Sequence, residues 1–372
     1  MAVAQVPDDQ IEREIYHAVS RGFEYLFQQG QGKGNWKLVD HTALVAMALT
    51  IREPKSSQWI KAVKSWLISQ QTELEQGVAS WDESVSDSAM ALIALLRMGV
   101  LPSDPAVAKG LKFLKRVFYY HNRPNWEDEP WETSWSITAI TESGDTDTLD
   151  EACQAVRWLA AMQEPSGAII APHYTAYFVN VVRAICHRQT QKGYCVMDEA
   201  RLQESAKKAS EYLMRTMDDD ELWTGEGWSN GQILWSLASG GRFPVEDRQS
   251  VNKVVSWFVR NQGVDGNWFD AEDTACAILG LVALLKDYLL HKAKGQGIQE
   301  DAETVIYNHL RRLYEAPKLN LGKKFFEVLE DGTTTLNFSP RAVKVAAIIF
   351  AIASGLTVVL AIWEYIAEAL GI

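Results

Sequence analysis

The chain has 372 residues, and 47% of them are hydrophobic, which is ample for a large packed core. Its formal net charge is −12 and no basic stretch is visible, which argues against nucleic acid as a partner. Four cysteines without a CxxC pair exclude a disulfide scaffold and favour a reducing compartment.

The first part of the chain predicts a helical hairpin. Residues 11–29 have the spacing of an outer, amphipathic helix, and residues 39–50 form a largely apolar run. Between them lies a polar turn that contains Gly34, Asn35 and Trp36. A helix that is apolar nearly all round has to be surrounded by other protein.

Similar hairpins recur along the chain. They cover residues 65–96, 111–140, 157–185, 211–238 and 256–285. The turn tryptophans at 36, 81 and 126 are 45 residues apart, and Trp228 and Trp268 are 40 apart, whereas the fourth hairpin lacks a turn tryptophan. A sustained period in this range predicts a repeat architecture.

Six apolar helices, each preceded by a more amphipathic one, can bury themselves as an inner ring inside an outer ring. We therefore predict an all-α fold, an α/α toroid of about six helical hairpins, in residues 1–317. The glutamine of each turn is expected to bond the backbone of the neighbouring hairpin, while the tryptophan covers it.

The C-terminal part of the chain predicts a membrane tether. Residues 318–340 read as a polar linker, and residues 341–372 as a tail that contains 19 uncharged residues, 345–363. This run predicts a single transmembrane helix, with a buried core helix as the alternative. Cations on its domain side predict a cytoplasmic large domain. Small residues in the middle of this run could let such helices pack together, so a homo-oligomer is a further possibility.

Two of the turns resemble a known repeat. The first reads Arg21-Gly22…Tyr25-Leu26…Gln29…Gly34-Asn35-Trp36, and the last reads Ser256-Trp257-Phe258…Gln262…Gly266-Asn267-Trp268. Both are similar to the QW repeat of squalene–hopene and oxidosqualene cyclases, whose superfamily includes the protein prenyltransferase β subunits. The resemblance covers roughly residues 10–290. It implies a toroid around a central cavity, with a prenyl or polyprenyl lipid as the ligand.

The resemblance also implies a set of acidic residues. Class II cyclases carry Asp-x-Asp-Asp, usually followed by Thr-Ala, and the middle Asp protonates a double bond or an epoxide. The matching stretch here begins at Asp270 and places Glu272 in the middle and Asp273 last. Asp40, in a similar position in the first hairpin, is a second candidate acid. Helix capping is the alternative for these residues, because acids recur at similar places in three repeats.

Carbocations in such a cavity would need aromatic faces nearby. The expected cavity-lining residues are His41, Trp135, Tyr174, Tyr177 and Trp235. A cyclase of this kind needs no cofactor and no metal, so none is expected.

Two other functions stay open at this stage. A protein prenyltransferase β-like subunit would bind zinc, for which Asp273, Cys276 and the downstream His291 are the loosely spaced candidates. A non-catalytic toroid would instead be a binding module, acting as a membrane-tethered sensor or effector. An apolar cavity with one polar mouth suits a prenyl chain under either the cyclase or the binding-module hypothesis.

Overall fold

The structure is a computed structural model that describes residues 10–295, except residues 31–32, 121–122, 146–147 and 193–198. The side chains of residues 187–192 also lie outside the described part. The predicted linker, 318–340, and the predicted membrane span, 345–363, lie outside the described residues, so both stay predictions.

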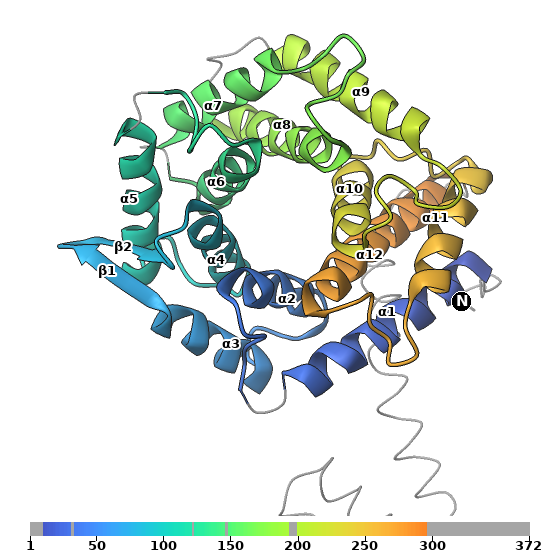
Figure 1. Cartoon of the computed structure of the whole chain (residues 1–372), viewed down its shortest axis with the longest axis horizontal. Helices are drawn as coiled ribbons and strands as arrows, with labels where there is room; N and C mark the ends of the chain where they lie inside the picture. The colour runs from blue at the N-terminus through green and yellow to red at the C-terminus, as the bar shows by residue number, and fades with distance from the viewer. Residues whose placement is uncertain (1–9, 31–32, 121–122, 146–147, 193–198, 296–372) are drawn as a thin grey trace, which may run out of the picture. The chain divides into compact units, whose positions relative to one another are not determined.

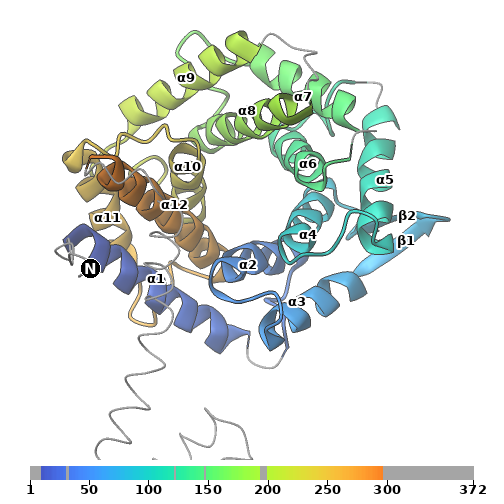
Figure 2. The ribbon, with the colours of Figure 1, turned by 180° about the vertical axis from the view of Figure 1, so that it is seen from behind.

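Within the described residues, twelve helices alternate between an outer and an inner ring (Figures 1 and 2), which confirms the predicted all-α toroid. The outer ring consists of α1 (Gln10–Gln29), α3 (Gln58–Ser69), α5 (Pro105–Tyr120), α7 (Leu149–Ala161), α9 (Glu199–Thr216) and α11 (Arg248–Asn261). The inner ring consists of α2 (Val39–Arg52), α4 (Val85–Arg97), α6 (Pro130–Ser143), α8 (Pro172–Lys192), α10 (Gly227–Ser239) and α12 (Ala271–Gly295).

Burial explains why the two kinds of helix occupy different rings. Outer helix α1 buries one stripe, with Ile15, Val19, Phe23 and Leu26 at most 2% exposed. These residues recur every three or four positions, as expected for an amphipathic helix that faces a core. In inner helix α4, by contrast, every residue from 88 to 95 is buried. The inner helices therefore form the core of the ring.

In five of the six hairpins, a buried tryptophan joins the outer helix to the inner helix that follows it. The indole Nε1 of Trp81 donates to the carbonyl oxygen of Leu67 at 2.6 Å, and its backbone N–H donates to Ser88 Oγ at 2.9 Å. The same two types of bond are made by Trp36, Trp126, Trp223 and Trp268. In the fourth hairpin Ile169 keeps only the backbone bond, to Thr175 Oγ1 at 2.9 Å.

The fifth turn corrects the sequence interpretation. Trp223, and not Trp228, occupies the turn position, because its Nε1 donates to Leu213 O at 2.7 Å. Its backbone N–H donates to Asn230 Oδ1 at 3.2 Å. Trp223 and Trp268 are 45 residues apart, so the spacing of the first three turns is restored. Trp228 lies at the start of the next inner helix, α10, and is not the turn tryptophan.

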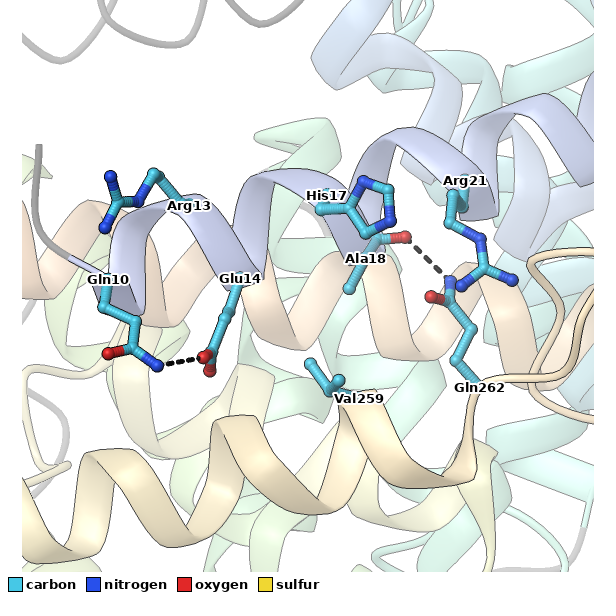
Figure 3. A pocket seen from close by; sticks show the side chains of 8 residues that line it. All are labelled: Gln10, Arg13, Glu14, His17, Ala18, Arg21, Val259 and Gln262. Carbon is cyan, nitrogen blue, oxygen red and sulfur yellow. Dashed lines mark hydrogen bonds between the residues drawn. The ribbon is translucent and has the colours of Figure 1, made fainter.

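Turn glutamines join neighbouring hairpins. Gln262 Nε2 donates to Ala18 O and to Gly266 O, both at 2.8 Å, and so links the last hairpin to α1 (Figure 3). Gln163 Nε2 reaches Ser205 O at 2.9 Å in the same manner. These bonds are the inter-repeat contacts expected of the turns, and the one from Gln262 closes the ring.

The second turn contains an element that the sequence analysis missed. Strands β1 (Gln71–Glu75) and β2 (Val78–Trp81) form an antiparallel hairpin, with Gln71 opposite Trp81. Gly77 adopts a φ of 78°, which a glycine tolerates and which permits the tight reversal. The hairpin projects from the outer ring (Figure 1).

Among the described helices, α12 is long and apolar enough to cross a membrane by length and composition alone. Most of its apolar segment is nevertheless buried inside the ring. It packs so closely on α10 that a Cβ added to Gly231 would lie 2.4 Å from the carbonyl carbon of Cys276. This backbone contact is typical of a core helix.

Candidate functional site

The first turns of all six inner helices meet at one end of the ring. The second and third residues of these helices, which we call the rim, are Asp40 and His41, Ser86 and Asp87, Trp131 and Glu132, His173 and Tyr174, Trp228 and Ser229, and Glu272 and Asp273. Contacts between inner helices connect residues of the rim. The rim contains the N-termini of the inner helices, where the helix dipole favours negative charge.

Glu272, the predicted middle acid, forms an ion pair. Its Oε2 lies 3.0 Å from His41 Nε2, which joins α12 to α2. The hydrogen bond to Glu272 raises the pKa of His41, because the adjacent carboxylate stabilises the imidazolium. The arrangement therefore favours the charged form of His41.

Two of the other candidate acids accept backbone N–H groups at helix starts. Asp270 Oδ1 accepts the backbone N–H of Asp273 at 3.0 Å at the start of α12, which is the bond of a helix cap. Asp40 lies inside the first turn of α2, where its Oδ1 accepts the backbone N–H of His41 at 2.7 Å. The cap position of α2 is Leu38, whose side chain makes no capping bond.

Asp273 differs from its neighbours. It is 7% exposed, and its Oδ1 accepts the backbone N–H of Trp228 at 2.7 Å, which joins α12 to α10. Burial raises the pKa of Asp273 to about 7. On α4, burial likewise raises the pKa of Asp87 to about 6, with the nearby Asp40 adding to the effect. Both carboxyls thus hold a proton far above the usual range of an aspartate.

Glu132 is the rim acid that the sequence analysis missed. It hydrogen-bonds Ser86, which joins α6 to α4, and burial raises its pKa to about 7. Its Oε2 is buried and has no hydrogen-bond partner among the described residues. The available signal was its position, since Glu132 is the third residue of its helix, as Asp87 and Asp273 are of theirs.

The raised pKa values predict an effect on stability. An unfolded chain releases the Glu132 proton near pH 4.3, whereas the folded chain retains it to about pH 7. The folded state therefore binds more protons between these values, and its unfolding free energy falls as pH rises through this interval. We expect Glu132→Gln to stabilise the protein by about 1–3 kcal/mol more at pH 8 than at pH 4.

Thermal unfolding of the wild type and the Glu132→Gln variant at both pH values measures this difference. The comparison cancels the other titrating groups, including His41, whose raised pKa acts on both proteins alike. A stability difference between the two proteins that does not change with pH would contradict the assignment.

Aromatic rings cover the other half of the rim. Trp131 on α6 contacts Trp135, Tyr177 on α8 and Trp228 on α10, with ring centroids 5.7, 5.1 and 6.2 Å apart. His173 lies 5.2 Å from Trp228. Helices α6 and α10 are separated by α8 in the ring (Figure 1), so the contact between Trp131 and Trp228 bridges two helices that are not direct neighbours. Sequence reasoning had missed Trp131 and Trp228.

The expected cavity-lining residues separate into two groups. Tyr174 contacts His173 at 4.2 Å, and Trp135 contacts Tyr177 at 5.8 Å, so these residues belong to the aromatic cluster. Trp235 does not. It lies under the guanidinium of Arg97, 5.1 Å away, near the C-terminal end of α4 and thus toward the opposite end of the ring.

The zinc hypothesis is wrong for the predicted residues. Asp273 and His291 lie on the same helix, α12, and 18 residues of helix span about 27 Å. They cannot share an ion. Cys276 is buried and accepts a bond from Gln232 Nε2 at 3.5 Å. In the described part of the chain, no three His, Cys, Asp or Glu side chains are grouped as a metal site.

A surface pocket of about 200 Å³ lies elsewhere, between α1 and α11 (Figure 3). It is lined by Gln10, Arg13, Glu14, His17, Ala18, Arg21, Val259 and Gln262. No rim residue lines it, and Gln262 is engaged in closing the ring. It is a groove between two outer helices rather than part of the rim.

Comparison with known proteins supports the fold. No family model matches this chain, and no curated protein matches it. Solved structures do match, among them two of variants of the type II terpene cyclase MstE from Scytonema in complex with geranylgeranyl dihydroxybenzoate, its substrate. Their TM-scores are 0.54 and 0.52 at 10% sequence identity. The matches cover 74% of this chain and 98% and 97% of those chains.

The fold of this chain is therefore terpene cyclase-like. The match also bears on the number of rings, because it spans nearly the whole of each neighbouring chain. One ring of this size is thus enough for the fold of a type II terpene cyclase.

Proposed function

We propose that the ring binds a prenyl lipid at its rim and cyclises it by proton transfer. The observation that carries this proposal is a carboxyl that holds its proton near neutral pH beside aromatic faces. Glu132 is that carboxyl, and Trp131 and Trp135 of the same helix belong to the aromatic cluster. A proton donor and a set of cation-stabilising surfaces are what this reaction needs.

In the proposed reaction, Glu132 transfers its proton to the terminal double bond or epoxide of the bound chain. The π electrons of an alkene form the new C–H bond, or the epoxide opens, and a tertiary carbocation results. Further double bonds of the chain attack this cation in turn and close rings. Aromatic faces such as those of Trp131 and Tyr177 lower the energy of the cationic intermediates.

We assign the opposite role to Glu272. The family pattern makes it the acid, but its ion pair with His41 suits a carboxylate. A carboxylate can accept the proton that leaves the last carbocation and so complete the reaction. Glu132 as the acid and Glu272 as the base would divide the two proton transfers between two carboxyl groups.

The proposed proton transfer bears on the class of substrate. A proton from a carboxyl needs an alkene or an epoxide to accept it, so we propose that the reacting end of the lipid is one of these uncharged groups. The similar cyclase binds a geranylgeranyl chain on an aromatic acid. We therefore propose a prenyl chain as the core of the substrate.

The proposal is tested by incubating the full-length protein in detergent with squalene, oxidosqualene, geranylgeranyl dihydroxybenzoate or a prenyl diphosphate. We expect a product of unchanged mass with fewer double bonds from at least one of the first three. Release of diphosphate would instead indicate ionisation of the substrate, which the proposal excludes. A lipid that binds and is recovered unchanged in every case would contradict catalysis.

The second candidate is a non-catalytic binding module. The pairing of Glu272 with His41 favours it, because the position that the family uses as its acid is occupied by an ion pair. A ring that retained the fold and lost the reaction would bind the lipid and release it intact. In the incubation with lipids, a binding module would therefore bind a lipid that is recovered unchanged.

We further propose that residues 345–363 anchor the protein to a membrane, with the ring in the cytoplasm. We expect the full chain to stay with membranes through carbonate extraction. A chain that ends at residue 335 should be soluble, because it lacks the only 19-residue uncharged run in the sequence. It should also keep the melting temperature of the ring. If the shortened chain only aggregates, the apolar run belongs to the core.

A further inference from the structure

One helical turn below the rim lies a second layer of side chains. It consists of the sixth residues of the inner helices, Leu44, Met90, Trp135, Tyr177, Gln232 and Cys276. Side chains three and four positions apart share a face of a helix, so these residues continue the faces that carry the rim. The contact between Trp131 and Trp228, on two helices that are separated by α8, indicates that these faces of α6 and α10 point inward.

The second layer has an apolar and a polar half. Leu44 and Met90 are at most 1% exposed and supply only apolar surface. On the other side, Trp135, Tyr177 and Gln232 are 2%, 4% and 1% exposed and carry polar atoms. The two halves would suit a ligand that is apolar on one side and oxygenated on the other.

Three polar atoms of this half, Trp135 Nε1, Tyr177 Oη and Gln232 Oε1, have no partner in the described part of the chain. The other polar atom of Gln232, Nε2, donates to Cys276 Sγ at 3.5 Å. Buried polar atoms are nearly always hydrogen-bonded, because burying them unpaired is destabilising. Other buried hydroxyls, such as those of Ser134 and Ser229, are also unpartnered, but these three atoms belong to large side chains at one level of three successive helices.

Their chemistry is complementary to a particular type of ligand. The indole N–H is a donor only, the phenol is a donor or an acceptor, and the amide oxygen is an acceptor only. Burial raises the pKa of Tyr177 well above its ordinary value, so its O–H remains a donor. Together they match a carbonyl, epoxide or hydroxyl oxygen that accepts two hydrogen bonds, with a hydroxyl hydrogen for Gln232.

We infer that the second layer binds an oxygen-bearing part of the lipid, with Trp135 and Tyr177 as donors and Gln232 as acceptor. The natural ligand is then an oxygenated isoprenoid and not a plain hydrocarbon. Trp135 and Tyr177 act through their polar atoms as well as through their ring faces. This inference rests on the proposed function, because it assumes that a prenyl lipid enters the ring.

The test compares ligands that differ by one oxygen. Binding of squalene and 2,3-oxidosqualene, and of geranylgeraniol and its deoxygenated hydrocarbon, is measured for the full-length protein in detergent. We expect the oxygenated member of at least one pair to bind roughly 10-fold more tightly. In the Tyr177→Phe variant its affinity should fall about 3- to 10-fold, the equivalent of one hydrogen bond, while the hydrocarbon binds as before.

A matched control and a second readout separate binding from structure. Tyr212→Phe makes the same chemical change on outer helix α9 and should alter neither affinity. In the ligand-free protein, Tyr177→Phe should raise the melting temperature, because it removes an unpaired buried hydroxyl. A hydroxyl with a purely structural role would lower the melting temperature when removed.

The outcomes distinguish the inference from the proposed function. If Tyr177→Phe weakens the hydrocarbon and the oxygenated lipid equally, or lowers the melting temperature, the inference fails and the proposed function stands. If the wild type binds no member of either pair, the proposed function fails and the inference fails with it.

Discussion

Replacing Glu132 with glutamine is expected to slow cyclisation by about 100- to 10,000-fold, the usual contribution of a general acid. Glutamine keeps the size and the hydrogen-bonding capacity of the side chain but has no acidic proton. Lipid affinity should therefore change by less than about twofold, while the rate of the chemical step falls. Single-turnover conversion, measured beside equilibrium binding of the same lipid, separates the two effects.

Glu129→Gln is the matched control for this prediction. Glu129 is exposed, precedes α6 directly and makes no side-chain capping bond, so its replacement should leave the rate unchanged. Glu272→Gln tests the alternative, in which the middle residue of the family pattern is the acid. Full activity of Glu132→Gln together with complete loss in Glu272→Gln would return the acid to Glu272.

Replacing Trp81 with alanine is expected to destabilise the ring by about 3–5 kcal/mol, the usual cost of removing a fully buried tryptophan. Trp81 is 0% exposed, and its Nε1 bond to Leu67 links α3 to the second inner helix. The substitution leaves a large cavity and removes one of the hydrogen bonds to the Leu67 carbonyl, which keeps the bond from the backbone N–H of Gln70. Denaturant unfolding of the two proteins measures the difference.

Trp66→Ala serves as the comparison. Trp66 lies one position before Leu67 on outer helix α3 and is only partly buried. Its loss should cost well under half as much, because less apolar surface leaves the core. Equal destabilisation by the two substitutions would show that the turn tryptophans have no special role in joining the helices.

The fold could be predicted from the sequence because the hydrophobic pattern and the turn residues repeat. The same reasoning failed in two turns. Trp223 and Trp228 lie within six residues of each other, and only the bonds to Leu213 and Asn230 identify Trp223 as the turn residue. In the second turn, a short hairpin around Gly77 takes the place of a simple loop.

The site was predicted less well, for a different reason. The family pattern led to Asp270, Glu272 and Asp273, which the structure places at the rim or next to it. The surroundings of each carboxyl come from other helices: Glu272 pairs with His41 of α2, and Glu132 is buried against α4, where it hydrogen-bonds Ser86. These partners are distant in sequence, so spacing alone does not reveal them.

The aromatic residues show the same limit. Trp135 and Trp235 appeared equivalent, since each lies inside an apolar inner helix. In the structure, Trp135 belongs to the aromatic cluster, whereas Trp235 contacts Arg97 near the opposite end of the ring. The position of each tryptophan along the ring axis decides what it contacts. This position depends on where its helix begins.

The most direct test of the account is a reaction in deuterium oxide. Carbon-bound deuterium reports proton transfer from the protein to the lipid, because an exchangeable carboxyl such as Glu132 becomes deuterated in this solvent. With a substrate that ends in an alkene, the account predicts a cyclised product that carries one solvent deuterium on carbon and is absent for Glu132→Gln. Cyclised product without deuterium, or bound substrate recovered unchanged from intact protein, would contradict it.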